Sequence, residues 1–358
     1  MTASDAEHGP ADDWAAAVGV GEPDPELTTV GPDLAVIHQG RHARRHEGLT
    51  PDTAYELDGF SFRTLAAPGE RLATFATVND VHFGEELCGV IEGSNVGPVF
   101  RSAPGEAPYP EVMNRAAVAE IVALGPDAVI VKGDLTSNGT VAEYEAFRAV
   151  YEPAFGERLT VVRGNHESYN HLPNAADPFQ EITLPGATLA VIDTSIDGKV
   201  AGTVSADQVA QIDELGARAD RPVLLFGHHH LGDRASREKA DRTFGIDCDA
   251  SEALLAVVAR RPAIRAYFAG HTHRNRVRRF AATGDVAWVE VACVKDYPGA
   301  WAEYRVHEGG IVQIEHRIST AEALAWTEQT RHMYAGLYRD YAFGTLADRC
   351  FVVPAVPS

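Results

Sequence analysis

Short apolar runs alternate with helix-length stretches from about residue 71 onward, and this alternation limits the fold more than any other feature. Seven runs rich in valine, leucine, isoleucine or phenylalanine occupy residues 72–78, 128–131, 159–162, 188–192, 222–226, 264–268 and 286–291. Such runs are typical of strands buried on both faces of a sheet. Helical stretches lie between several of them, at residues 110–124, 141–151, 205–219 and 252–260, with Ser205 and Ser251 as the expected N-caps of the last two. The pattern predicts a layered α/β domain.

Five of these runs are followed by side chains of the kinds that bind metal ions. The first run ends in Asp80 and His82, which point to the same side of an extended chain. The second is followed by Asp134, behind a glycine that lets the backbone approach a site closely. The loops beyond the carboxyl ends of strands form the ligand crevice in layered α/β proteins, so these groups should converge. For Asp134 alone, a capping role in a turn is the alternative.

The other three clusters add amide and imidazole groups. They comprise Asn165 and His166, then His228, His229 and His230, and finally His271 and His273. An asparagine carbonyl serves hard cations, whereas His166 cannot easily bind the same ion as its neighbour and is left for the substrate. Each cluster alone could be a set of exposed or hydrogen-bonded core residues. Their order along the chain, each after an apolar run, favours a single metal site.

Taken together, the clusters resemble the pattern DxH, GD, GNH(D/E), H and GHxH of the calcineurin-like metallophosphoesterases, over roughly residues 71–318. The resemblance implies a layered α/β metallophosphoesterase fold with two central mixed β-sheets flanked by helices. It also implies two metal ions, the first held by Asp80, His82 and His273, the second by Asn165, His228 and His271, with Asp134 as the bridge. His229 is the alternative to His228, because this chain has His230 where many relatives have proline.

The same resemblance implies a mechanism of phosphoester hydrolysis. A hydroxide held by two ions would attack phosphorus, and His166 would protonate or orient the leaving oxygen. Glu167 is a candidate to orient His166. Phosphate contacts are candidates at His229, Arg163, Arg274 and Arg276, with a solvated surface charge as the alternative for the last two. Ligands of this kind suit divalent or iron-type ions alike, so Fe, Mn, Zn and Co remain open.

Loop sequences indicate a branch of the family. The segment GDLTSNGTVAEYEAF, from Gly133, lacks the arginine of protein Ser/Thr phosphatases and has Ser137 where purple acid phosphatases have a tyrosine ligand. It is similar to bacterial cyclic-nucleotide and glycerophosphodiester phosphodiesterases, as is VKDYPG at residues 294–299. We therefore expect a phosphodiesterase acting on small molecules. The alternatives are a broad phosphomonoesterase and a non-catalytic metal-binding scaffold.

Charge and composition limit which partners and which cellular compartment are expected. The net charge of −20 argues against a nucleic acid polymer as partner, and no apolar run is long enough to span a membrane. Residues 1–40 carry eight acidic side chains and no lysine or arginine, unlike a secretory signal, so we expect a cytoplasmic protein. The four scattered cysteines are expected to be free thiols.

The expected domain organisation has four parts. Residues 1–45 form an irregular acidic arm, residues 46–70 a short β element, residues 71–318 the catalytic domain, and residues 319–358 a C-terminal helix and tail. An isolated helix of this length is marginal in water, so the C-terminal segment should pack against something. The options are the metal cleft, a second subunit in a homodimer, or the back of the domain.

Overall fold

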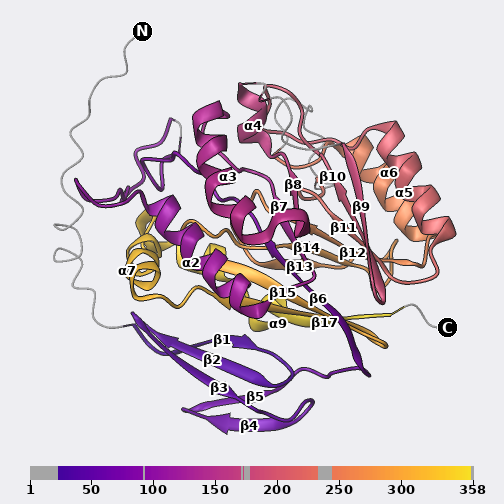
Figure 1. The fold of residues 1–358 in the computed structure, drawn as a ribbon, viewed down its shortest axis with the longest axis horizontal. Coiled ribbons are helices and arrows are strands. Elements are labelled where there is room, and N and C mark those ends of the chain that lie inside the picture. Colours follow the sequence, from indigo (N-terminus) through magenta and orange to yellow (C-terminus); the bar gives the residue numbers. More distant parts are fainter. Residues whose placement is uncertain (1–22, 92, 171, 173–177, 233–243, 356–358) are drawn as a thin grey trace.

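The computed structural model describes residues 23–91, 93–170, 172, 178–232 and 244–355, and two six-stranded sheets form its centre (Figure 1). The first sheet has the order β13-β14-β12-β11-β10-β9 and consists of β9 (Phe179–Leu184), β10 (Ala187–Ile192), β11 (Val223–Phe226), β12 (Ile264–Ala269), β13 (Arg276–Arg278) and β14 (Ala287–Glu290). The second has the order β17-β16-β15-β6-β7-β8 and consists of β6 (Arg71–Val78), β7 (Ala128–Lys132), β8 (Leu159–Val162), β15 (Ala300–His307), β16 (Gly310–Arg317) and β17 (Cys350–Pro354). All seven apolar runs are strands, and the predicted α/β fold with two mixed sheets is confirmed.

Each sheet contains one block of adjacent parallel strands, and this is why their polar ends meet. β6, β7 and β8 run parallel to one another, as do β10, β11, β12 and β14. Their inward side chains fill one core between the two sheets, in which Phe75 stacks on Tyr304 with ring centroids 4.5 Å apart and Phe226 on Phe268 at 5.1 Å. Aromatic pairs at such distances add to the free energy gained by burial. The packed core fixes the two sets of strand ends relative to each other.

Helices cover the outer faces of both sheets. α2 (Tyr109–Leu124) and α3 (Val141–Phe155) pack on the second sheet, and α5 (Ala206–Arg218) and α6 (Cys248–Arg260) pack on the first (Figure 1). Ser205 caps α5 as expected. The expected cap Ser251 is wrong, because α6 begins three residues earlier, where the Asp247 side chain accepts a hydrogen bond from the amide of Ala250. No helix in the described part of the chain is both long and apolar enough to cross a membrane.

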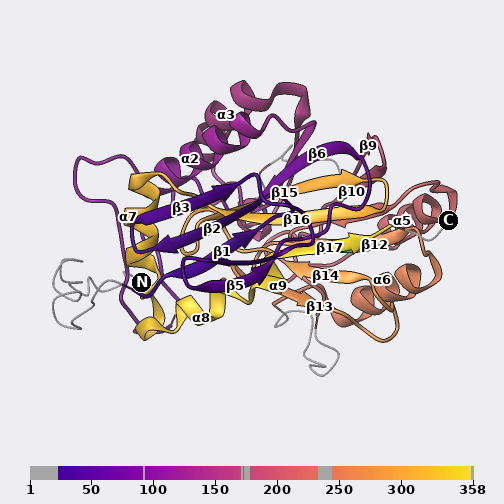
Figure 2. The same ribbon diagram turned by 90° about the horizontal axis from the view of Figure 1, so that it is seen from below.

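The N-terminal region departs from the expected irregular arm. Residues 1–22 lie outside the described residues, but β1 (Glu26–Val30), β2 (Leu34–Gln39) and β3 (His42–Glu47) form an antiparallel sheet. This sheet lies over β16 (Figure 2), where the Thr29 hydroxyl donates a 2.7 Å hydrogen bond to the carbonyl of Glu315. β2 forms because its apolar side chains are buried, and the acidic composition of this region conceals that apolar face in the sequence. The hairpin of β4 (Ala54–Leu57) and β5 (Phe60–Arg63) follows, within the expected β element.

The C-terminal segment is more than a helix and a tail. It contains α7 (Ala321–Thr330), a 3₁₀ turn (Tyr334–Gly336), α8 (Tyr338–Phe343), α9 (Leu346–Arg349) and the edge strand β17. β17 pairs antiparallel with β16, so residues after 318 complete the second central sheet. Among the four cysteines, which are all free thiols, Cys350 at the start of β17 is buried. Truncation at residue 319 would therefore remove part of the core rather than an appendage.

Candidate metal centre

The five polar clusters lie together at the carboxyl ends of the central strands. Asp80 and His82 follow β6, Asp134 follows β7, and Asn165 opens the short helix α4 (Asn165–Tyr169) after β8. His228 follows β11, while His271 and His273 follow β12. These seven side chains are the metal ligands expected from the sequence, and ion-pair or hydrogen-bond distances connect them into one cluster.

Five of the seven residues adopt a backbone conformation that side chains other than glycine rarely take. Their φ angles lie between 48° and 66°, at Asp80, His82, Asp134, His271 and His273. Each such conformation costs of order 1–3 kcal/mol and persists only where the surroundings enforce it. Strain of this kind is concentrated at functional sites. The fold therefore sacrifices local stability to direct these side chains toward one point.

Two glycines allow the strand ends to approach one another. A Cβ atom on Gly133 would lie 2.6 Å from Nδ1 of His228, and one on Gly164 would lie 2.1 Å from Oδ1 of Asp134. Gly133 also has a φ of 86°. Any larger residue at either position would separate the side chains that the cluster brings together. The glycines of the GD and GNH motifs are thus required by close packing at the site.

One half of the cluster is built from two carboxylates and two imidazoles. Asp80, His82, Asp134 and His273 each place one ligand-type atom within 4.8 Å of the others. Nε2 of His82 lies 3.6 Å from Oδ2 of Asp134, and Nε2 of His273 lies 3.6 Å from Oδ1 of Asp80. This is the set expected for the first ion, together with the bridging carboxylate.

The other half is built around His228. Its Nε2 atom lies 3.0 Å from Oδ1 of Asn165, 3.2 Å from Nδ1 of His271 and 3.3 Å from Oδ2 of Asp134. The Asn165 amide nitrogen donates to the hydroxyl of Tyr169 at 2.6 Å, which turns the carbonyl oxygen toward His228. Asp134 consequently faces both halves of the cluster.

The distant nitrogens of the two imidazoles in this half are held by the backbone. Nδ1 of His228 donates to the carbonyl of Lys132 at 2.9 Å, and Nε2 of His271 donates to the carbonyl of Phe244 at 2.6 Å. A hydrogen bond on one nitrogen fixes the tautomer and leaves the lone pair of the other for a metal. Both rings are therefore oriented as metal-binding histidines usually are.

His229 also lies near this half. One ring nitrogen from each of His228, His229 and His271 lies within 4.8 Å of the other two. The two nitrogens of His229 already have partners, however, since Nδ1 lies 2.8 Å from the Thr194 hydroxyl and Nε2 donates to the carbonyl of Val200 at 3.0 Å. Proximity alone would admit His229 as a ligand, whereas the hydrogen bonds favour His228. A ligand needs a lone pair directed at the ion, and the partners of both His229 nitrogens lie outside the cluster.

The electrostatics of the cluster suit cations. Burial lowers the pKa of His82 and His271 well below the usual value, which keeps these rings neutral. Burial also disfavours a charged His228, but the adjacent Asp134 outweighs this and raises the pKa of His228 to about 9. For Asp134, burial is outweighed in turn by the His228 and His166 imidazoles, which hold the pKa of the carboxyl well below its usual range. The site thus favours bound positive charge.

His82 provides an independent test of whether a metal fits. Its side chain is buried, yet neither ring nitrogen has a hydrogen-bond partner among the described residues. A buried polar atom without a partner costs about 1–3 kcal/mol. A metal ion between His82 and Asp134 would remove that cost for Nε2, the nitrogen that faces Asp134. The donor set of carboxylate, carbonyl and imidazole groups therefore fits two metal ions.

His166 lies at the edge of the cluster. Its Nε2 atom is 3.9 Å from Oδ2 of Asp134, and the side chain is 27% exposed. Nδ1 donates to the carbonyl of Ser137, which fixes the ring. The expected orienting role of Glu167 is wrong: this carboxylate is buried and accepts hydrogen bonds from Thr136 and from the Gly164 amide instead. The role of Ser137 could not be inferred from the sequence, because its contribution is a backbone carbonyl.

The arginines named as candidate phosphate contacts have other partners. Arg163 donates to Asp193 at 2.7 Å and to Asp197 at 3.1 Å. Arg274 donates to the buried Glu290 at 2.8 Å, and Arg276 lies 4.0 Å from the same carboxylate. The structure does not direct these guanidinium groups to the metal cluster by any hydrogen bond among the described residues.

Asp296 is a neighbour of the cluster that the sequence pattern did not reveal as a site residue. Its Oδ2 atom lies 3.6 Å from Nδ1 of His273, on the side of the ring opposite Asp80. The only signal was its place in the segment 294–299, which indicated a family branch but no role. A carboxylate that contacts a ligand from behind leaves no spacing pattern in the sequence.

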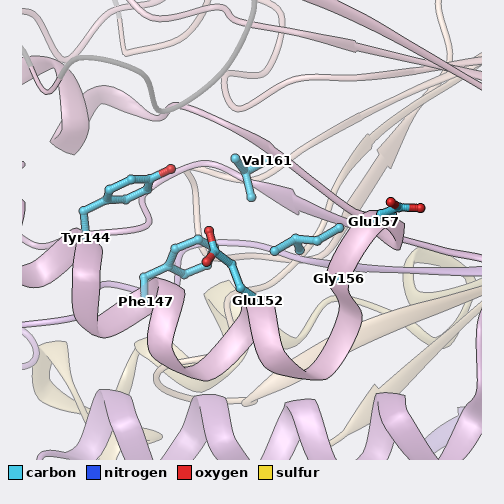
Figure 3. A pocket seen from close by; sticks show the side chains of 7 residues that line it. Tyr144, Phe147, Glu152, Gly156, Glu157 and Val161 are labelled. Carbon is cyan, nitrogen blue, oxygen red and sulfur yellow. The ribbon is translucent and has the colours of Figure 1, made fainter.

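A surface pocket lies away from the cluster, between α3 and β8 (Figure 3). It is lined by Tyr144, Phe147, Glu152, Gly156, Glu157, Leu159 and Val161. None of these residues belongs to the metal cluster, and the lining contains no histidine. Its composition gives no indication of phosphoester chemistry.

Comparisons with known proteins agree with this geometry. A family model described as calcineurin-like phosphoesterase matches residues 73–275. The chain is 30% identical over 162 residues to a cAMP/cGMP dual specificity phosphodiesterase of Mycobacterium tuberculosis (strain CDC 1551 / Oshkosh), over 42% of this chain and 49% of that protein. It is 28% identical over 174 residues to a glycerophosphodiester phosphodiesterase of Enterobacter lignolyticus (strain SCF1), over 43% of this chain and 59% of that protein. The chain thus spans only about half the length of these relatives.

A solved structure supports the fold. The dimetal phosphatase from Danio rerio superimposes with a TM-score of 0.54 at 17% identity, covering 70% of this chain and 98% of that one. At this identity the likeness concerns the fold alone. The family match, by contrast, covers more than half of the chain and spans every residue of the cluster, from Asp80 to His273, in one continuous region. The chain belongs to the calcineurin-like phosphoesterase family.

Proposed function

We propose that this protein is a dinuclear-metal phosphodiesterase that hydrolyses small phosphodiesters of the cyclic-nucleotide or glycerophosphodiester type. The observation that carries the proposal is the position of Asp134, whose Oδ2 atom lies 3.6 Å from Nε2 of His82 and 3.3 Å from Nε2 of His228. One carboxylate that faces two groups of ligands is the arrangement required to bridge two ions. The names of the two bacterial relatives support the substrate class.

The ligands assigned here are Asp80, His82 and His273 for one ion and Asn165, His228 and His271 for the other, with Asp134 shared. When bound, two divalent or iron-type ions supply the positive charge that neutralises phosphate oxygens and activates water near neutral pH. The chain itself supplies their spacing, because the strained backbone and the two close-packed glycines fix the ligand positions before any ion arrives.

His166 is the candidate proton donor. With Nδ1–H held by the Ser137 carbonyl, Nε2 is the atom that faces the cluster and can carry the transferred proton. An imidazole N–H that reaches the leaving oxygen can act as a general acid. His229 would have to give up a hydrogen bond to contact a phosphate, and the guanidinium groups of Arg163 and Arg274 are directed to carboxylates outside the cluster. We therefore rank these three residues below His166 as substrate contacts.

A phosphomonoesterase and a non-catalytic scaffold are the alternatives. A scaffold does not need His166 held beside the cluster. The test is hydrolysis of bis-p-nitrophenyl phosphate and p-nitrophenyl phosphate by protein loaded with Mn²⁺, beside protein stripped with a chelator. We expect metal-dependent cleavage with the diester preferred. Preference for the monoester would assign the alternative activity, and absence of both activities in protein that retains two metals would favour the scaffold.

The expected partners follow from the same chemistry. We propose a small phosphoester as the ligand, because of the family and the names of the relatives. The acidic composition supports our proposal that no nucleic acid polymer is a partner, and the acidic N-terminal region and the free thiols support a cytoplasmic location. The C-terminal segment could also form the interface of a homodimer. Sedimentation of the purified chain measures the oligomeric state.

A further inference from the structure

The carboxylate of Asp296 lies buried between the metal cluster and the C-terminal segment. The residue is 2% exposed. Its Oδ2 atom lies 3.6 Å from Nδ1 of His273 and 3.5 Å from Nζ of Lys295. A buried charge is costly unless it is paired, and Lys295 supplies the opposite charge. The carboxylate therefore stays ionised beside His273.

The other oxygen of Asp296 is anchored from the far side. Oδ1 accepts a 2.6 Å hydrogen bond from the hydroxyl of Tyr338, the first residue of α8, and lies 2.9 Å from Sγ of Cys293. These contacts to Oδ1 restrict the rotation of the carboxylate and keep Oδ2 on the side where His273 and Lys295 lie. A residue 42 positions further along the chain thus determines where this carboxylate points.

The His273 ring lies between two carboxylates. Nε2 faces Asp80 at 3.6 Å and Nδ1 faces Asp296 at 3.6 Å. A carboxylate that faces Nδ1 attracts the ring proton to that nitrogen and so favours the tautomer whose Nε2 lone pair is left for a metal. In the other half of the cluster backbone carbonyls serve this purpose for His228 and His271. For His273 the group that faces the distant nitrogen is a side chain, at an ion-pair distance of 3.6 Å, so it can be changed by mutation.

The C-terminal segment also contacts the loop that carries His273. The hydroxyl of Tyr341 donates to the carbonyl of Thr272 at 2.9 Å, and the amide of Asn275 donates to the carbonyl of Ala342 at 2.9 Å. α8 (Figure 2) thus contacts this loop on both sides of His273. Of the three options for the C-terminal segment, contact with the metal cleft is the one that these bonds favour.

We propose that Asp296 is a positioning residue for His273, and that Tyr338 holds Asp296 in place. Through this contact the C-terminal segment contributes to metal binding. The inference rests on the proposed function in one respect, since it takes His273 as a ligand of the first ion. It predicts that the metal affinity of the first site depends on the hydroxyl of Tyr338, which contacts neither the metal nor the substrate.

The test compares Asp296→Asn and Tyr338→Phe with a matched control, Tyr151→Phe. Tyr151 is also a buried tyrosine of the same core cluster, and its hydroxyl donates a 2.6 Å hydrogen bond to Oδ1 of Asn114. Titration of chelator-stripped protein with Mn²⁺ by calorimetry gives the affinity of each site, and circular dichroism gives the unfolding temperature of each metal-free variant.

Loss of such an outer partner typically costs 10–100-fold in metal affinity. We expect a loss of about 10–100-fold at one site in Asp296→Asn, a smaller loss at the same site in Tyr338→Phe, and wild-type affinity at both sites in Tyr151→Phe. Equal affinities in all four proteins would overturn the inference. Equal weakening by Tyr338→Phe and Tyr151→Phe, in step with unfolding temperature, would overturn it as well, because it would show a purely structural effect. If wild-type protein bound no second ion, the proposed function itself would fail first.

Discussion

Oδ2 of Asp134 lies 3.3 Å from Nε2 of His228, although 94 residues separate the two in the chain. They meet because β7 and β11, from different sheets, end at the same edge of the sandwich. A carboxylate and an imidazole that face each other in a buried site attract a cation between them, and in its absence the imidazole retains a proton. In the proposed function, bound ions would give the site a local positive charge, so a net charge of −20 does not argue against a small anionic substrate.

Replacement of Asp134 should affect both halves of the site. In Asp134→Ala, we expect loss of both metals and of all metal-dependent hydrolysis, because the shared carboxylate is missing from each. Elemental analysis after gel filtration measures the metal content. Asp213→Ala, which removes a partly exposed carboxylate on α5 that pairs with Arg260 and Arg261, is the control and should retain both metals. Two metals per chain in Asp134→Ala would exclude the bridging role.

Replacement of His166 should separate catalysis from metal binding. In His166→Ala, we expect both metals to remain and turnover to fall by roughly 10²–10⁴-fold, the usual contribution of a general acid. The loss should be smaller for bis-p-nitrophenyl phosphate than for a cyclic nucleotide, because a nitrophenolate leaves without protonation. Steady-state kinetics on both substrates measure the difference. An equal loss on the two would contradict the role as proton donor, and a loss of metal would make His166 a ligand.

The adjacent histidines His228 and His229 should give opposite phenotypes. His228→Ala should weaken metal binding in the half of the site that contains Asn165 and His271. His229→Ala should leave metal binding intact and lower the free energy of unfolding by about 1–3 kcal/mol, since the Thr194 hydroxyl and the Val200 carbonyl lose a buried partner. Calorimetric metal titration and urea unfolding distinguish the two. Exchanged phenotypes would move the ligand to His229.

The stability of the metal-free protein should depend on pH through Glu315. Burial raises the pKa of this carboxyl from 4.5 to about 8. A raised pKa in the folded state means that the stabilising contribution is complete below pH 4.5 and is lost as the pH rises through 8. The free energy of unfolding should therefore decline across this window, by at most about 1.4 kcal/mol per pH unit for one proton.

Urea unfolding of chelator-treated protein at several pH values between 5 and 8 measures that slope. Glu315→Gln keeps the shape of the side chain without its proton equilibrium, so its slope should be shallower than that of the wild type. Glu322→Gln, at an exposed carboxylate of α7, is the control and should keep the wild-type slope. Parallel curves for the wild type and Glu315→Gln would show that Glu315 does not titrate in this window.

The sequence was sufficient to predict the parallel strands and the residues that follow them. Their apolar runs are local signals, and parallel strands place their carboxyl ends at one edge whatever the loops between them do. This is why the side chains from Asp80 to His273 could be grouped from the sequence alone. The choice between His228 and His229 could not be made in this way, because it depends on hydrogen bonds to Lys132, Thr194 and Val200 from distant segments.

The antiparallel half of the second sheet was not predicted, for a different reason. β15 and β16 are buried along their full length but carry polar and charged side chains, among them Glu303, Arg305 and His316. These groups pair with one another beneath the N-terminal sheet, where Arg305 also contacts Asp33 at 2.7 Å. A buried strand that carries charged residues shows no regular hydrophobic pattern, and the partners that allow those charges to be buried come from distant parts of the chain. Within the predicted irregular arm, the strands from Glu26 onward were missed for a similar reason, because polar and acidic neighbours obscure the apolar face of β2.

The metal centre proposed here places two ions on either side of one carboxylate, held by seven side chains from five strand ends. Anomalous diffraction from crystals of the protein loaded with Mn²⁺ tests this directly. We expect two peaks about 3.5–4 Å apart, the spacing of two-metal hydrolytic sites, one near His82 and the other near His228, with Asp134 between them. A single peak, or two peaks that do not share Asp134, would contradict the proposed centre.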